Sequence, residues 1–216
     1  MKKTLLITAF LIAVFSFNNL NAQVKGGFKL GADFSRLNMT TDDENEDDLK
    51  RLISPRLGFI IEVPVNDFLF VQAGVFGAAK GWRVSEEDAG DTYKAMMILG
   101  TIDIPIQFGY KYDLGNIKLF GMAGPVISYN VYSTLVYKFG DEDWDNDNSY
   151  KIGNSEADFF KPLNMGVNIE AGVELNRFQF SAFYMQGLSN LNTQDGDKYT
   201  TNVIGLTAAI KFGRVD

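Results

Sequence analysis

The amino-acid sequence predicts an all-β fold, an eight-stranded antiparallel up-and-down transmembrane β-barrel, and its alternating apolar residues are the first reason. Residues 101–111 read Thr-Ile-Asp-Ile-Pro-Ile-Gln-Phe-Gly-Tyr-Lys, so every even position from Ile102 to Tyr110 is large and apolar. Successive side chains of a strand point to opposite faces, which gives this segment one apolar and one polar face. The same rhythm recurs about eight times along the chain.

The lengths of the connections are the second reason. Turn-forming residues make short joins at 66–67, 113–116 and 176–177. The joins between them are longer and cover residues 36–53, 82–94, 132–158 and 190–200. Outer-membrane barrels alternate short periplasmic turns with long external loops. An even number of strands then places both termini in the periplasm.

The expected strands each have the roughly ten residues that a tilted spanning strand needs. We expect them at about 24–35, 54–65, 68–81, around 101–111, and at 117–131, 163–175, 178–188 and 201–213.

The N-terminal segment has the layout of a secretory signal. Two lysines precede an apolar run over residues 5–17, and a polar stretch then leads to the small residue Ala22. The run is about 13 residues long, short of the roughly 20 that a spanning helix needs. We therefore expect a cleaved signal peptide at 1–22 and a barrel domain at 23–216.

Charged residues follow the same division between strands and loops. The four long joins hold 19 of the 27 acidic residues. The polar faces of the strands carry most of the remaining acids, and bases accompany them: Asp33, Glu62, Asp103, Glu170 and Glu174 with Lys29, Arg56, Lys80, Lys111 and Lys211. Side chains fill the interior of a small barrel, so we expect these charges to form ion pairs. Pro105 also faces inward, which predicts a bulge or a missing bond there.

Four stretches of sequence resemble a known family. They are Ile-Asp-Ile-Pro-Ile at 102–106, Gly-Met-Ala-Gly-Pro at 121–125, Gly-Val-Asn-Ile-Glu-Ala-Gly-Val-Glu at 166–174 and Gln-Gly-Leu-Ser-Asn-Leu at 186–191. With them the mature chain resembles the PorT-like outer-membrane β-barrel family. The resemblance implies an eight-stranded outer-membrane barrel. The founding member of that family is similar to accessory parts of a protein-secretion and gliding apparatus.

The composition argues against an enzyme. The chain has no histidine and no cysteine, which removes Ser-His-Asp catalysis, histidine-bound zinc and disulfides. Glu170 and Glu174 lie four residues apart on one strand face, roughly 13 Å, too far to share a proton. We predict no catalytic residue, no cofactor site and no metal site.

One acidic loop partly matches a calcium-binding pattern. Asp143, Asp145 and Asp147 have the alternating spacing that opens a calcium loop. However, Asn148 stands where the glycine is expected, and Asn154 where the closing glutamate is expected. A solvated acidic loop that gathers divalent ions loosely is the alternative. The run from Asp42 to Asp48 has the same two interpretations, or could dock a basic partner.

These features predict a non-catalytic integral protein of the outer membrane, with an envelope-structural or partner-scaffold role. The family resemblance implies an accessory role in protein secretion. The expected partners are outer-membrane lipid, lipopolysaccharide and envelope or secretion proteins. A net charge of −7 argues against nucleic acid. We expect a monomer. The alternatives are a small-solute pore, or a soluble exported ligand-binding barrel whose apolar faces point inward.

Overall fold

The computed structural model describes residues 24–40, 49–88, 91–140, 142–148, 150–194 and 197–213. The predicted signal peptide at 1–22 and the acidic run from Asp42 to Asp48 lie outside the described residues. No helix in the described part of the chain is long and apolar enough to cross a membrane.

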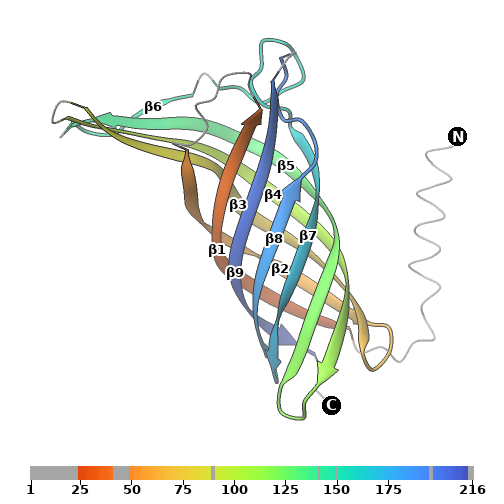
Figure 1. The fold of residues 1–216 in the computed structure, drawn as a ribbon. Coiled ribbons are helices and arrows are strands. Elements are labelled where there is room, and N and C mark those ends of the chain that lie inside the picture. The colour runs from red at the N-terminus through yellow and green to blue at the C-terminus, as the bar shows by residue number, and fades with distance from the viewer. Residues whose placement is uncertain are drawn as a thin grey trace, which may run out of the picture.

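Eight long antiparallel strands form a closed barrel, as predicted (Figure 1). They run in the order β4-β3-β2-β1-β9-β8-β7-β5, and pairing of β4 with β5 closes the ring. A ninth strand, β6, is three residues long and extends the edge of β5. The strands are β1 Lys25–Thr40, β2 Lys50–Pro64, β3 Leu69–Asp88, β4 Asp91–Asp113, β5 Lys118–Phe139, β6 Asp145–Asp147, β7 Leu163–Leu175, β8 Phe178–Gly187 and β9 Lys198–Phe212.

The outward face of each barrel strand is apolar, whereas the inward face carries the charged and polar side chains together with buried apolar ones such as Phe76 and Phe183. On β4, Phe108 is 68% exposed, whereas its neighbour Gln107 is 2% exposed. All eight strands place their apolar and polar faces as predicted, because side chains alternate across each strand. A soluble ligand-binding barrel would need the reverse arrangement. The interior therefore carries the charges, and the exterior is a continuous apolar belt.

Three tight turns lie together at one end of the barrel, here called the turn end. The side-chain oxygen Oδ1 of Asn66 accepts hydrogen bonds from the backbone N–H groups of Phe68 and Leu69. Asp113 accepts one from the N–H of Gly115, at 2.7 Å. Asn176 has a φ of 54°, the left-handed conformation that asparagine tolerates. The predicted short joins are thus confirmed.

At the opposite end, here called the loop end, the strands run further than predicted. The expected loop at 36–53 is shorter, because β1 runs to Thr40 and β2 begins at Lys50. The expected loop at 82–94 is a hairpin, because β3 continues to Asp88 and β4 begins at Asp91. Residues 132–139 of the expected loop at 132–158 also belong to a strand, since β5 runs to Phe139. We call residues 81–88, 91–98, 132–139 and 145–147 the arm. Figure 1 shows the arm leaving the barrel sideways.

The arm begins at a β-bulge. On β5, Asn130 pairs with Thr101 and Tyr132 pairs with Gly100, which leaves Val131 as the extra residue. The ring of Tyr132 lies over Gly100, where an added Cβ would come within 2.0 Å of it. Bulges bend a strand and increase its twist, so this one marks where the sheet turns away from the barrel.

At Pro105 the expected local defect takes the form of an interruption in pairing. The β3 partners of β4 resume at the same register on either side of Pro105, with Ala73 opposite Ile106 and Phe76 opposite Asp103. Proline lacks the N–H that a ladder bond needs.

Candidate functional site

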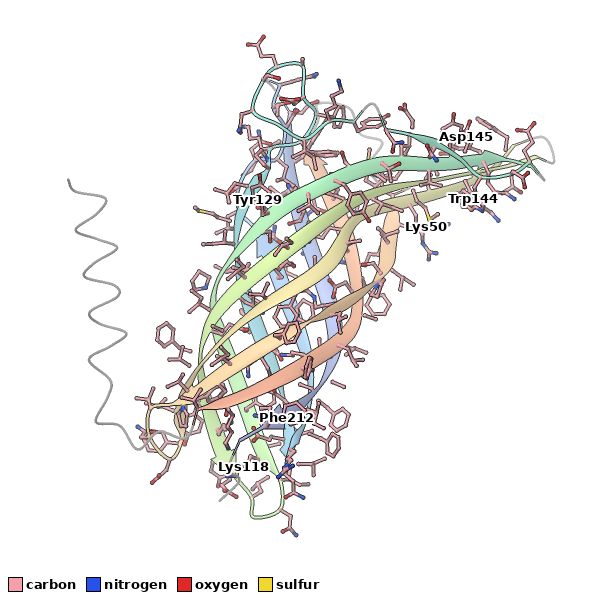
Figure 2. The ribbon with its side chains drawn as sticks, turned by 180° about the vertical axis from the view of Figure 1, so that it is seen from behind. Lys50, Lys118, Tyr129, Trp144, Asp145 and Phe212 are labelled. Atoms are coloured by element: carbon pink, nitrogen blue, oxygen red, sulfur yellow. The ribbon has the colours of Figure 1, made fainter. Side chains whose placement is uncertain are left out.

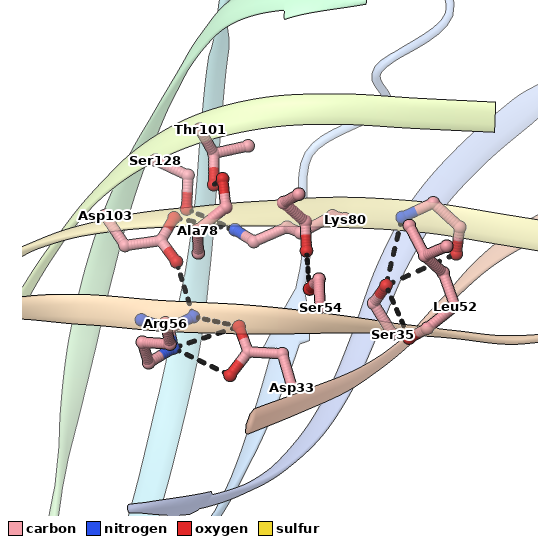
Figure 3. Close-up of polar contacts among 12 residues, drawn as sticks. Asp33, Ser35, Leu52, Ser54, Arg56, Ala78, Lys80, Thr101, Asp103 and Ser128 are labelled. Atoms are coloured by element: carbon pink, nitrogen blue, oxygen red, sulfur yellow. Dashed lines mark hydrogen bonds and ion pairs between the residues drawn. The ribbon is translucent and has the colours of Figure 1, made fainter. Parts of the chain in front are cut away.

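The interior of the barrel contains a first cluster of charges around Arg56 (Figure 3). The Arg56 guanidinium donates to Asp33 at 2.9 Å and to Asp103 at 2.7 Å. Lys80 donates to the other oxygen of Asp103 at 2.7 Å and to the Ser128 hydroxyl at 2.9 Å. The four charged residues come from β1, β2, β3 and β4, so this cluster ties four neighbouring strands together.

Aromatic rings enclose the Arg56 guanidinium. Its carbon lies 5.4 Å from the ring centroid of Phe76 and 5.0 Å from that of Phe183. These distances suit cation–π contacts, which are strongest where water is excluded. Phe183 belongs to β8, across the barrel, so Arg56 spans the interior.

A second cluster joins β1 to β7. Lys29 forms an ion pair with Glu170, and both side chains are buried. The Ser181 hydroxyl donates to the same carboxylate at 2.5 Å and lies 2.6 Å from the Thr207 hydroxyl. Lys29 and Ser181 therefore bind the same oxygen of Glu170, Oε1, inside the barrel.

The third cluster is a four-residue network near the turn end. Lys211 donates to Glu62 at 2.9 Å and to Glu174 at 2.5 Å. Lys111 pairs with both carboxylates as well, and its nitrogen lies 4.6 Å from the ring centroid of Phe70.

All ten predicted interior charges are thus in ion pairs. Glu170 and Glu174 belong to different clusters, as their spacing on the strand predicted. Removing one member of such a buried pair leaves an uncompensated charge. The clusters therefore act as fixed cross-links inside the barrel.

A cavity of about 80 Å³ lies at the turn end of the barrel and is lined by Glu62, Lys111 and Glu174. A smaller cavity, of about 20 Å³, lies between the first two clusters and is lined by both Arg56 and Glu170. Gln107 and Asn168 also line it, and each has a buried polar atom without a hydrogen-bond partner. The smaller volume suits about one water molecule rather than a solute.

An apolar cap covers the loop end of the interior. Its buried members are Leu37, Met97, Leu99, Phe160 and Leu191. Phe160 and Leu191 come from the segments that precede β7 and β9. The backbone holds these segments together, with the N–H of Lys161 donating to the Leu191 carbonyl at 2.8 Å. This cap was missed by sequence reasoning; the apolar pair Phe159–Phe160 beside an otherwise polar loop was its signal.

The aspartates of the calcium pattern do not converge. Asp145 and Asp147 lie in β6, where they pair with Tyr137 and Leu135 of β5. Asp145 accepts a hydrogen bond from the Tyr137 hydroxyl at 3.3 Å, and its negative charge raises the pKa of that tyrosine. Among the described residues, no group of three or more acidic, histidine or cysteine side chains is placed to hold a metal ion.

Comparison with solved structures finds outer-membrane barrels. Ail of Yersinia pestis, bound to a heparin analogue, shares 12% identity with a TM-score of 0.41, over 88% of this chain and 99% of Ail. Neisserial surface protein A shares 11% with a TM-score of 0.42, over 88% and 97%. OprG of Pseudomonas aeruginosa shares 13% with a TM-score of 0.39, over 89% and 96%. No functional conclusion follows from identities this low.

Sequence comparison identifies the family. No curated protein sequence matches this chain at a significant level. The family model described as "Outer membrane protein beta-barrel domain" matches residues 7–192, well over half of the chain. The match agrees with the closed ring of strands, the apolar exterior and the charged interior. The chain therefore belongs to the outer membrane protein beta-barrel domain family.

Proposed function

We propose that this protein is a closed, non-catalytic anchor in the outer membrane that presents its arm and loops to other envelope components. The observation that carries the proposal is the filled interior. Three ion-pair clusters span the barrel and an apolar cap covers one end. Eight strands leave an interior just wide enough for side chains, so the barrel supports attachment better than transport.

The proposed orientation places the turn end in the periplasm and the loop end outside. Short turns on one side and long excursions on the other support it, because outer-membrane barrels are built this way. The start of β1, at Lys25, and the end of β9, at Phe212, would then both lie on the periplasmic side. The arm would stand on the cell surface.

A finer role follows from the resemblance to PorT-like barrels, which suggests accessory work in protein secretion. Within this role the barrel is a monomer that holds a secretion or envelope protein through its external parts. Outer-membrane lipid and lipopolysaccharide surround it.

Conductance tests the closed anchor. The purified protein is inserted into planar bilayers after its folding is checked by heat-modifiable gel migration. We expect no stable single-channel steps. Steps that persist in the unaltered protein and change in amplitude when Arg56 is replaced would overturn the anchor in favour of a pore.

Surface labelling tests the orientation. The chain has no cysteine, so single cysteines can be placed freely. Glu156→Cys lies at the loop end and Asn116→Cys at the turn end, and both positions are exposed. A membrane-impermeant maleimide should label only the first in intact cells and both in lysed cells. Labelling of only the second in intact cells would invert the orientation.

Photo-crosslinking tests the scaffold role. A photoreactive residue at Glu86, exposed on the arm, is compared with one at Leu114, exposed at the turn end. A deletion strain carrying the protein without its arm is compared with one carrying the whole protein for secretion and envelope integrity. Full activity of the armless barrel, with no arm-specific crosslink, would leave the scaffold proposal contradicted.

A further inference from the structure

The arm has two faces of different character, and the strand register defines them. Residues paired directly across antiparallel strands share a face. Trp82 pairs with Met97, and Met97 pairs with Leu135, so these three lie on the face that continues the barrel interior. Arg83 pairs with Met96, and Met96 pairs with Val136, on the other face. We call these the inner face and the outer face of the arm.

The outer face of the arm carries bases. Lys94 pairs directly with Lys138, and Arg83 lies on the same face, one strand away. Lys50, at the end of β2, is paired with Arg83. Among the described side chains, none of these four cations forms an ion pair with a carboxylate. Like charges placed opposite each other are destabilising, so this face is built at a cost to the isolated arm.

The inner face of the arm carries acids. Asp145 and Asp147 of β6 pair with Tyr137 and Leu135 and therefore lie on this face. Glu86 pairs with Tyr93 on the same side. Figure 2 places Asp145 on the opposite side of the arm from Trp144 and Lys50. Asp145, Asp147 and Glu86 therefore lie on the face opposite to Arg83, Lys94 and Lys138.

The outer face of the arm continues the lipid-facing belt of the barrel. Along β4, alternate residues run from Ile104 and Ile102 in the belt, through Ile98 and Met96, to Lys94 on the arm. Both figures show the arm bending sideways away from the barrel. A strand that bends away from the barrel axis turns its outward face toward the membrane plane. The bases on the outer face of the arm therefore face the membrane surface.

Aromatic side chains accompany these bases. Tyr132 is 52% exposed at the root of the arm. Trp144 is 49% exposed near the tip, with the Lys138 nitrogen 5.8 Å from its ring centroid. Tryptophan, tyrosine and basic residues together are the side chains that favour a membrane–water interface.

We propose that the outer face of the arm rests on the anionic, phosphorylated lipid headgroups of the outer leaflet that surrounds the barrel. The inference builds on the proposed orientation, which places the arm outside. Anionic headgroups attract the four bases, the aromatic residues enter the interfacial region, and the acidic inner face stays in water. Both faces favour the same pose, since a flipped arm would set its acids against phosphate.

Neighbouring labels on opposite faces test the proposal. Ser85→Cys and Glu86→Cys are exposed and adjacent, and alternation puts them on the outer and inner face. Each variant carries an environment-sensitive fluorophore, and the full chain is reconstituted in phosphatidylcholine vesicles with or without lipid A. We expect acrylamide to reach the label at 86 equally in both vesicles. The label at 85 should be shielded only where lipid A is present.

Charge variants identify the cause of the shielding. In the Ser85→Cys background, Arg83→Gln, Lys94→Gln and Lys138→Gln are combined. The matched control replaces three bases near the turn end: Lys25→Gln, Lys118→Gln and Arg177→Gln. Each base near an anionic surface changes the ratio of bound to free arms about fivefold. The arm variant should lose its shielding and the control should keep it, and concentrated salt should act like the arm variant.

Other occupants give other results. Equal shielding at 85 without lipid A would overturn the proposal in favour of purely apolar contact. Shielding at both positions that grows with the protein-to-lipid ratio would overturn it in favour of a second copy, whose acidic face could meet the basic one. Relief of shielding by inorganic phosphate at unchanged ionic strength would point to free phosphate instead. None of these results depends on conductance, so the closed anchor is judged separately.

Discussion

The barrel interior and the arm use charge in opposite ways. Inside the barrel, acids and bases from different strands alternate in space, are buried, and form ion pairs. On the arm, Arg83, Lys94 and Lys138 gather on one face, and Glu86, Asp145 and Asp147 lie on the other. Paired charges hold a structure together, whereas separated charges leave attraction available for a partner. The barrel is therefore closed by its internal ion pairs, and the arm is the part available to bind a partner.

Replacement of matched arginines gives the largest expected contrast. Arg56→Met removes the group that neutralises Asp33 and shares Asp103 with Lys80. Breaking a buried ion pair from one side costs about 3–5 kcal/mol. Arg83→Met on the arm should change the free energy of unfolding by no more than about 0.5 kcal/mol. Urea unfolding of both variants in lipid vesicles, followed by tryptophan fluorescence, measures the difference.

Equal losses for the two arginines would contradict the comparison. So would a gain in stability for Arg56→Met, which is the known outcome when an entire buried network, rather than one member, becomes apolar.

Replacement of matched phenylalanines compares the cap with the arm. Phe160 is fully buried in the cap, whereas Phe139 is 54% exposed on the arm. Phe160→Ala should cost about 3 kcal/mol or more through the cavity it leaves. Phe139→Ala should cost much less, because its contacts with Tyr93 and Tyr137 are at an exposed edge. Limited proteolysis at the loop end, together with urea unfolding, would record both effects; comparable cleavage of the two variants would argue against a structural cap.

Replacement of matched glycines tests the root of the arm. A methyl group at Gly100 would collide with the Tyr132 ring, whereas one at Gly121 would meet nothing within 4 Å. Gly100→Ala should therefore cost about 1–3 kcal/mol, and Gly121→Ala should be close to neutral. Adding Tyr132→Ala should restore much of the loss at Gly100. If the double variant is no more stable than Gly100→Ala alone, the ring does not set the geometry of the bulge.

The alternation that predicted the barrel could not predict the arm. In the belt, outward positions such as Ile102 and Ile104 are apolar because they meet lipid. On the same strand the outward position Lys94 is basic, so the apolar rhythm ends while the strand continues. The sequence therefore appears as a loop wherever a strand leaves the lipid. Strand length beyond the membrane depends on pairing with β3 and β5, which periodicity does not reveal.

The interior charges were predictable, but their partners were not. Alternation places Lys29 and Glu170 on inward faces, yet they are 141 residues apart in sequence. Only the register of a closed ring brings them together. The contacts of the cap were harder still to predict, because Phe160 and Leu191 lie in irregular segments without an alternating pattern of apolar residues. Side-chain alternation thus predicts which face of a strand a residue occupies. Its partners depend on the register with which the strands close the ring.

The smallest expected effect concerns a carboxylate outside both regions. Asp158 accepts hydrogen bonds from the Ser155 hydroxyl at 2.5 Å and from its backbone N–H at 2.9 Å. Both hydrogen bonds lower the pKa of Asp158 below its ordinary value of 3.8, and the bond from the hydroxyl has the larger effect. A carboxylate whose pKa is lower in the folded state stabilises that state above its unfolded pKa. This contribution disappears as the pH falls through the folded pKa.

Ser155→Ala removes one donor and keeps the backbone donor. The pKa of Asp158 should rise toward its ordinary value, which an NMR titration of the carboxyl carbon in detergent micelles can follow. Asp158→Asn is the control, because it removes the titration altogether. An unchanged pKa in Ser155→Ala would mean that the hydroxyl bond contributes nothing. Because this side chain is solvated, the loop should respond to acid while the paired interior and the arm keep their structure.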